Sequence, residues 1–180
     1  ANRALMGSNM QKQALPCIVP EAPLVATGIE ELASRDTGRL VLSAEDGTVV
    51  EVDAKHVVVE GTKSGKKVGY TLVNFERTNY FTAYHQRPTV SVGQKVKKGD
   101  LLADTSTSDG GQIAIGQNAL VAFMSWNGAN YEDAIILSER LVKHSKFTSI
   151  HIEEFVCTVR DTKLGPEITT RDIPNVSEAK

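Results

Sequence analysis

Apolar positions between residues 36 and 104 come in short runs rich in valine and leucine, separated by glycines and polar residues. Runs of a few β-branched residues are typical of strands in a sheet. They predict strands at Leu40–Leu42, Val49–Val52, Val57–Val59 and Tyr70–Phe75. Asp46-Gly47 predicts a hairpin-type turn between the first two strands, and Thr62–Lys67 predicts a polar loop before the last.

Thr89–Asp104 has a rhythm of its own. Turns at Gly93-Gln94 and Gly99-Asp100 divide it into three short stretches. Because glycine readily takes the backbone conformations of tight turns, the segment predicts strand, turn, strand, turn and strand.

Other segments carry apolar residues at helical spacing, as Leu5, Met6 and Met10 do near one face. They predict helices at residues 2–13, Ile29–Ser34 and Glu132–Lys143. Three more apolar runs predict strands at Leu15–Val19, Ala119–Met124 and Thr148–Val159. Strands and helices do not alternate as βαβ units, so the pattern predicts a mainly β fold with a few helices rather than a doubly wound sheet.

Composition narrows the class of protein only slightly. The chain has 180 residues, of which 41% are apolar, enough for a buried core in one or two domains. Its formal net charge of −2 shows none of the basic excess common in nucleic-acid binders. No apolar run approaches the roughly 18 residues of a membrane span, and the first residues do not form a secretory signal.

The two cysteines and the chain ends add two further expectations. Cys17 and Cys157 lie far apart and predict reduced thiols rather than a zinc site or a disulfide framework. The chain opens in a helical pattern without an initiator methionine and ends without a finished element. Both ends are therefore expected to be internal to a longer chain.

The adjacent acids Glu132 and Asp133 are the strongest local candidates for chemistry. They follow the polar turn 126–130, at the start of the expected helix. Mg²⁺ is usually held by a few carboxylates together with substrate phosphates. The alternative is that acids in a first helical turn only complement the helix dipole.

A second candidate group lies near the N-terminus and combines cations with amides. Arg3 and Lys12 are possible phosphate contacts, and Asn9 and Gln13 are amides able to bond sugar or phosphate oxygens. The alternative is a solvated polar face. The lysines at 95, 97 and 98 are expected to be solvated, and the four histidines show no ligand spacing.

Several long strings resemble the β subunit of bacterial-type multi-subunit RNA polymerases. In chain order they are ANRALMGSNMQKQALP, LLADTSTSDGG, IAIGQNALVAFMSWNGANYEDAIILSERLV, RDTKLGP and DIPNV. Their order and spacing are similar to those of the family, strongly at 1–16 and 100–175 and weakly at 36–85. The resemblance implies a central part of that subunit, ending just before the flap region.

The resemblance also implies a fold. Residues 1–35 and 105–180 would form parts of a double-psi β-barrel at the active-site wall. Residues 36–104 resemble a barrel-sandwich hybrid inserted into it, in agreement with the rhythm at Thr89–Asp104. In the family this barrel faces a partner barrel in the β′ subunit.

Site roles follow from the same resemblance. Glu132 and Asp133 match the family's acidic pair near the second, nucleotide-associated Mg²⁺, reached partly through water. Arg3 matches an arginine that approaches the incoming triphosphate. Asn9 and Gln13 match polar residues close to the RNA 3′ end.

Position 12 departs from the family, which usually has arginine there. Lys12 keeps the charge but lacks the bidentate fork of arginine, so no directed contact is carried over.

The implied enzyme is a DNA-directed RNA polymerase, a nucleotidyltransferase that extends RNA by two-metal, in-line displacement. The aspartates for its first Mg²⁺ belong to β′, and no DFDGD string occurs here. The chain alone is therefore expected to be inactive. The implied partners are β′, the α subunits, the remainder of β, the DNA template, RNA and nucleoside triphosphates, in the cytoplasm at the nucleoid and without a membrane.

Two other functions stay open. VGQKVKKGDLL, at Val92–Leu102, also resembles the half-motif of biotinyl or lipoyl carriers, so a carrier or a β-barrel interaction module is the alternative. A carrier needs a modifiable lysine at a hairpin tip in a Met-Lys-Met-like context, which is absent, and an adduct in the intact mass would favour it. A free-standing hydrolase using Glu132 and Asp133 would lack a matched histidine or third carboxylate.

Overall fold

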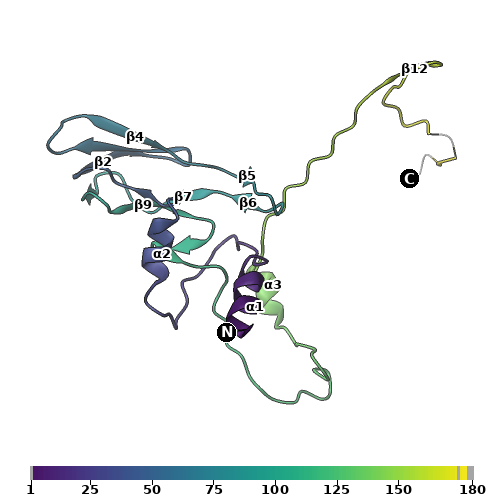
Figure 1. The fold of residues 1–180 in the computed structure, drawn as a ribbon, viewed down its shortest axis with the longest axis horizontal. Helices are drawn as coiled ribbons and strands as arrows, with labels where there is room; N and C mark the ends of the chain where they lie inside the picture. The colour runs from purple at the N-terminus through teal and green to yellow at the C-terminus, as the bar shows by residue number, and fades with distance from the viewer. Residues whose placement is uncertain (1, 174, 178–180) are drawn as a thin grey trace.

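The computed structural model describes residues 2–173 and 175–177. Figure 1 shows a β-rich body, a long loop below it and an extended C-terminal arm. Strands outnumber helices in the described residues, which confirms the mainly β prediction. The helices are α1 (Asn2–Gln11), α2 (Glu30–Asp36) and α3 (Glu139–Lys143). The strands are β1 (Val41–Leu42), β2 (Gly47–Val52), β3 (His56–Gly61), β4 (Lys67–Thr71), β5 (Glu76–Arg77), β6 (Ala83–Tyr84), β7 (Gln86–Pro88), β8 (Lys95–Val96), β9 (Leu101–Thr105), β10 (Ser108–Asp109), β11 (Gln112–Ile113), β12 (Asp161–Thr162) and β13 (Gly165–Pro166).

One layer of the body is a four-stranded antiparallel sheet in the order β4-β3-β2-β8. Side chains alternate between its two faces, so that Val57 and Val59 of β3 are fully buried while their neighbours are not. The polar loop predicted over 62–67 joins β3 to β4. The valine runs at 49–52 and 57–59 are thus strands, as predicted.

A second sheet, in the order β1-β9-β7, faces the first and closes the core. Figure 1 shows β9 and β7 beneath β2 and β4. Glycines 93 and 99 have positive φ angles of 86° and 89° in the turns before β8 and β9, which confirms both turns and the last two strands of the predicted rhythm. The first predicted strand of this segment is wrong, because β7 ends at Pro88 and residues 89–92 form no regular strand. The buried residues of the core are Val49, Val57, Val59, Leu72, Val90, Val96, Leu102 and Ala103.

The predicted hairpin at Asp46-Gly47 is wrong, because β1 pairs with β9 whereas β2 pairs with β3 and β8. Gly47 is instead the first residue of β2, opposite Gly61. A Cβ atom at this position would lie 2.4 Å from the Glu60 carbonyl oxygen. Gly47 is required by this close approach of two strands and not by a turn.

Outside the core, one predicted helix is shorter than predicted and three predicted strands are not regular strands. Helices form at both N-terminal predictions, as α1 and α2, but the helix predicted at Glu132–Lys143 is confined to α3. The predicted strands at Leu15–Val19, Ala119–Met124 and Thr148–Val159 are not regular strands. In the last of them, His151 makes only an isolated antiparallel bridge to Thr82.

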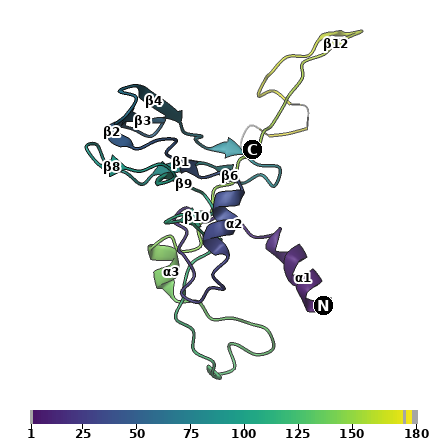
Figure 2. The same ribbon diagram turned by 60° about the vertical axis from the view of Figure 1, so that its left-hand side comes forward.

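α1 and the C-terminal arm project from the body, as Figure 2 shows. No residue of α1 is buried. In the described part of the chain, no helix has both the length and the apolar character needed to cross a membrane.

The start of α2 is fixed by one carboxylate. The Glu30 carboxylate accepts hydrogen bonds from Thr27 N, Thr27 Oγ1 and Gly28 N, each at 2.8 Å. These donors lower the pKa of Glu30 from 4.5 to about 2, with the Thr27 backbone N–H the largest cause. α2 packs against β11. The turn at Thr27 and Gly28, which fixes the start of α2, therefore also orders this edge of the body.

We expect the contribution of Glu30 to stability to depend on acid pH. Because the folded pKa lies below the unfolded value, the contribution is complete above pH 4.5 and is lost as the pH falls towards 2. An NMR titration of the Glu30 carboxyl should show a midpoint near pH 2, and Glu30→Gln should remove this acid sensitivity. A midpoint at the ordinary value of glutamate would contradict these hydrogen bonds to Thr27 and Gly28.

Candidate functional site

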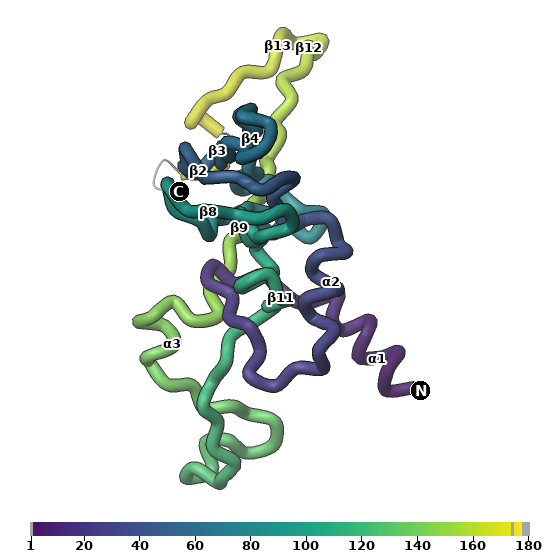
Figure 3. Tube along the Cα trace, turned by 90° about the vertical axis from the view of Figure 1, so that its left-hand side faces the viewer, coloured from purple at the N-terminus to yellow at the C-terminus, as the bar shows by residue number. Residues whose placement is uncertain are grey.

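Glu132 and Asp133 lie in a long projecting segment, residues 119–145, called the acidic loop below. In Figures 1 and 3 it includes the green segment at the bottom and, after it, α3. All its residues are exposed except Asn130 and Leu141, which are half-buried. Glu132 and Asp133 are therefore open to solvent.

The tip of the acidic loop is ordered by Asn130. Its side-chain oxygen accepts a hydrogen bond from Trp126 N at 3.0 Å, and its Nδ2 donates to the Met124 carbonyl at 2.7 Å. The chain then turns into the acidic pair, where Glu132 has a positive φ of 56°. The two carboxylates therefore follow a hydrogen-bonded turn and do not lie on a helix.

The acidic pair is not at a helix N-terminus, because α3 begins only at Glu139, with Ser138 as its N-cap. The Ser138 Oγ accepts a hydrogen bond from Arg140 N at 3.3 Å. The helix-dipole explanation of Glu132 and Asp133 therefore does not apply to this structure.

The chemistry of the acidic pair suits a metal that has other ligands elsewhere. None of the ion pairs in the described residues includes Glu132 or Asp133. No group of three or more His, Cys, Asp or Glu side chains that could hold a metal occurs within residues 2–173 and 175–177. Because Mg²⁺ takes one or two carboxylates plus substrate phosphates and water, a bare pair fits Mg²⁺ only when phosphate completes the coordination.

The second predicted group lies apart from the acidic pair. Arg3 and Asn9 are exposed on α1, and Gln13 is exposed in the turn after it, where Gln13 N bonds the Met10 carbonyl at 3.0 Å. α1 and α3 overlap in Figure 1, but Figures 2 and 3 show α1 on one side of the body and the acidic loop on another. The chain by itself does not bring the two groups together.

Large apolar side chains are exposed around both groups. In α1, Leu5 and Met10 are 66% and 57% exposed, and in the acidic loop Leu120 and Phe123 are 104% and 97% exposed. Burying a side chain of this size gives about 1.5–3 kcal/mol, so these surfaces gain much by being covered.

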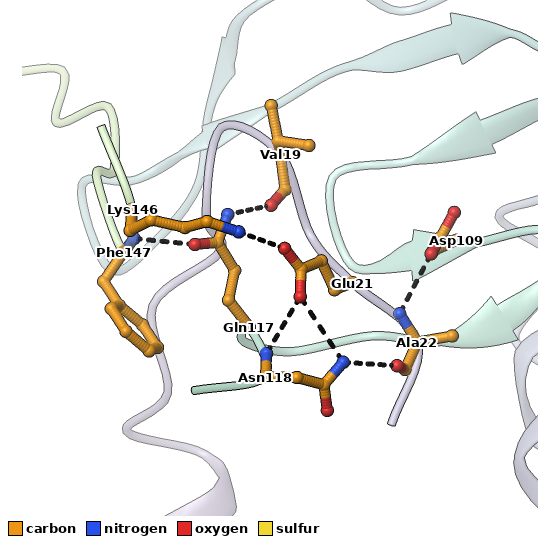
Figure 4. A network of polar contacts seen from close by, with 8 residues as sticks. All are labelled: Val19, Glu21, Ala22, Asp109, Gln117, Asn118, Lys146 and Phe147. Carbon is orange, nitrogen blue, oxygen red and sulfur yellow. Dashed lines mark hydrogen bonds and ion pairs between the residues drawn. The ribbon is translucent and has the colours of Figure 1, made fainter. Parts of the chain in front are cut away.

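A polar cluster at the base of the acidic loop was not predicted from the sequence. Figure 4 shows Glu21 between Lys146 and Asn118. The Glu21 carboxylate accepts from Lys146 Nζ and, at 3.0 Å, from Asn118 N. The Lys146 hydrogen bond, followed by the Asn118 backbone N–H, holds the pKa of Glu21 below its ordinary range.

Gln117 and Phe147 complete this base cluster, which we define as Glu21, Gln117, Asn118, Lys146 and Phe147. Gln117 Nε2 donates to the Val19 carbonyl, and Phe147 N donates to Gln117 Oε1 at 3.1 Å. Glu21 and Lys146 are 125 positions apart, so no local pattern could have paired them.

Comparisons with known proteins identify the family of the chain. The family model described as RNA polymerase Rpb2, domain 6, matches residues 42–180. The DNA-directed RNA polymerase subunit beta of Caldicellulosiruptor bescii is 54% identical over 178 residues, which cover 99% of this chain and 14% of the relative. The chain belongs to the RNA polymerase β-subunit family. The subunit beta of Sinorhizobium fredii is 55% identical over 184 residues, covering 99% of this chain and 13% of the relative.

These matches confirm the family resemblance of the sequence strings, and they cover nearly the whole chain. The chain spans about one seventh of the length of these relatives, since it covers 14% of one and 13% of the other. Family membership alone assigns no role to the acidic pair or to the polar residues of α1.

Proposed function

We propose that this chain contributes to DNA-templated RNA synthesis as part of a DNA-directed RNA polymerase, a nucleotidyltransferase. The observation that carries the proposal is the identity of 54% to a polymerase β subunit over 99% of the chain. Its partners are then β′, the α subunits, the remainder of β, the DNA template, RNA and nucleoside triphosphates, in the bacterial cytoplasm at the nucleoid.

Glu132 and Asp133 are assigned to the second, nucleotide-associated Mg²⁺. Both carboxylates are exposed on a projecting turn and free of ion pairs in the described residues, so both are available to an incoming charged group. The bound ion would neutralise charge on the pyrophosphate leaving group. The carboxylates would orient its water ligands.

Arg3, Asn9 and Gln13 are assigned to substrate positioning. Arg3 offers a planar cation for the incoming triphosphate, and the two amides offer donors and acceptors for the RNA 3′ end. The exposure of all three supports this assignment. Because α1 lies away from the acidic loop, the nucleotide and the RNA end would have to fill the space between them, together with other parts of the enzyme.

The domain division also remains a proposal. Residues 36–104 hold every buried residue of the core and all of its two sheets except Thr105, the last residue of β9, which supports an insertion with a core of its own. Segments from the two flanks meet, since Glu21 N donates to the Gly116 carbonyl at 2.9 Å. This pairing supports residues 1–35 and 105–180 as parts of one double-psi β-barrel.

Removing both carboxylates, by Glu132→Ala with Asp133→Ala, is expected to slow single-nucleotide RNA extension by the assembled polymerase about 10- to 100-fold, the usual effect of losing groups that orient the ligands of a metal. The loss should ease at high Mg²⁺, because a weakened site refills by mass action. The measurement is the extension rate against Mg²⁺ concentration.

Glu153 and Glu154 offer a matched control, as a second adjacent and exposed acidic pair in the same chain. Replacing both by alanine removes the same charge and should leave the rate and its Mg²⁺ dependence unchanged. If the Glu132 and Asp133 variant behaves like this control, the metal assignment is wrong. The chain alone is expected to show no extension.

A further inference from the structure

Both ends of the acidic loop meet at one carboxylate. Asn118, just before the loop, donates to Glu21 through its backbone N at 3.0 Å and through Nδ2 at 3.4 Å. Lys146, just after the loop, forms an ion pair with the other Glu21 oxygen. Figure 4 shows the two donors on opposite sides of Glu21.

The strand-like segment that carries Glu21 is itself tied to both neighbours. Glu21 N donates to the Gly116 carbonyl at 2.9 Å, and Ile18 N donates to the Thr148 carbonyl at 2.8 Å. Asn118 Nδ2 also donates to the Ala22 carbonyl at 2.9 Å. Hydrogen bonds therefore hold residues 18–22 between the two ends of the acidic loop.

Beyond this base, the loop has little to hold it within the described residues. Only Asn130 and Leu141 are half-buried, and the hydrogen bonds of the tip, such as that from Asn130 to Met124, are local. The hydrogen bonds to Glu21 instead fix the two points, Asn118 and Lys146, from which the loop leaves the body. The course of the loop towards the acidic pair therefore begins where these residues meet Glu21.

We propose that Glu21 and Lys146 are positioning residues, which aim the acidic loop and thereby place Glu132 and Asp133 at the nucleotide-associated metal. This inference rests on the function proposed above for the acidic pair. The side chains of Glu21 and Lys146 are only 31% and 35% exposed, so water screens their attraction less than it would for a fully exposed pair.

The test is single-nucleotide extension against Mg²⁺ concentration by the assembled polymerase carrying Lys146→Met. We expect the Mg²⁺ concentration for half-maximal rate to rise about tenfold, as for other losses of an outer-shell support. Lys146→Arg keeps the charge and should restore the original value. Glu21→Gln keeps the shape of the acceptor but loses the charge, and should reproduce the Lys146→Met effect.

Lys143→Met is the matched control. Lys143 lies three positions before Lys146, and its pair with Glu139 is highly exposed, at 71% and 86%. Because solvent screens such an exposed helix pair, this variant should leave the Mg²⁺ dependence unchanged.

The same variants in a Glu132→Ala, Asp133→Ala background separate the two proposals. If Glu21 and Lys146 act through the acidic pair, Lys146→Met has no further effect there. An equal effect in both backgrounds, or none in the original one, overturns the positioning role and leaves the acidic pair standing. If the alanine pair itself leaves the rate and the Mg²⁺ dependence unchanged, the metal assignment fails and the positioning role fails with it.

Discussion

Replacing Leu102 by alanine is expected to lower the free energy of unfolding of the chain by about 3–4 kcal/mol, within the range for leucine truncations in a well-packed core. Leu102 is fully buried on β9, the central strand of the three-stranded sheet. Its side chain belongs to the core that joins this sheet to Val49, Val57 and Val59 of the other. Truncation would leave a cavity between the two layers, where neither backbone can move without breaking strand pairing.

Denaturant unfolding followed by far-ultraviolet circular dichroism measures this loss. Tryptophan fluorescence is a poor choice, because Trp126 lies in the exposed acidic loop. Leu164→Ala is the control, since Leu164 is 101% exposed and its truncation should change stability by less than about 0.5 kcal/mol. Equal losses from the two variants would mean that the two sheets do not share one core.

The sequence predicted the β body well because its signals are local. In residues 41–105, valine runs and glycine turns recur within a few positions of each other, and the partners that bury them lie in the same segment. The helix at α1 was also predicted, although none of its residues is buried. The helical spacing of Leu5, Met6 and Met10 was enough for that prediction.

The predictions for 119–124, 132–138 and 148–159 failed for a different reason. An apolar pattern shows that a face gains from burial, but it does not show what covers that face. In the structure Leu120, Phe123 and Phe155 are almost fully exposed. Without a surface to pack on, a short amphipathic segment gains too little to hold a helix or strand, so only the capped turn at α3 remains.

The candidate site, too, was predictable from the sequence only where its signals are local. Glu132 and Asp133 could be proposed as candidates from residue type and from the turn before them, which are local, but their role at a metal was implied only by the family resemblance. Their backbone conformation could not be predicted, because a positive φ at Glu132 is uncommon for a residue with a side chain. The pairing of Glu21 with Lys146 could not be found either, because it depends on how distant segments fold together.

Asp104 is expected to matter nearly as much as Leu102, for polar rather than apolar reasons. Asp104 is 3% exposed, and its carboxylate accepts hydrogen bonds from Ser108 Oγ at 2.7 Å, Gly110 N at 2.9 Å and Gly111 N at 3.0 Å. Asp104→Ala would leave the donors of Ser108 and Gly111 buried without this acceptor, whereas Gly110 is exposed to water. Because each unsatisfied buried group costs about 1–3 kcal/mol, we expect a total loss of about 3 kcal/mol.

Asp100→Ala is the control for this variant. The Asp100 carboxylate also accepts from a backbone N–H, that of Lys97 at 2.8 Å, but it is exposed, so water replaces it at a cost of about 1 kcal/mol or less. Equal losses for Asp104→Ala and Asp100→Ala would show that the buried network adds nothing to stability. Asp104→Asn should lie between, since its single carbonyl oxygen still accepts.

The turn that Asp104 fixes also leads to the base of the acidic loop. This turn includes Asp109, whose carboxylate accepts a hydrogen bond from Ala22 N at 2.9 Å. Ala22 is the residue after Glu21. Amide hydrogen exchange at Ala22 should therefore quicken in Asp104→Ala and stay unchanged in Asp100→Ala. If Ala22 keeps its protection in Asp104→Ala, the β core and the base cluster are stabilised independently. If Ala22 loses that protection, the β core also stabilises residues 18–22, which anchor the base of the acidic loop.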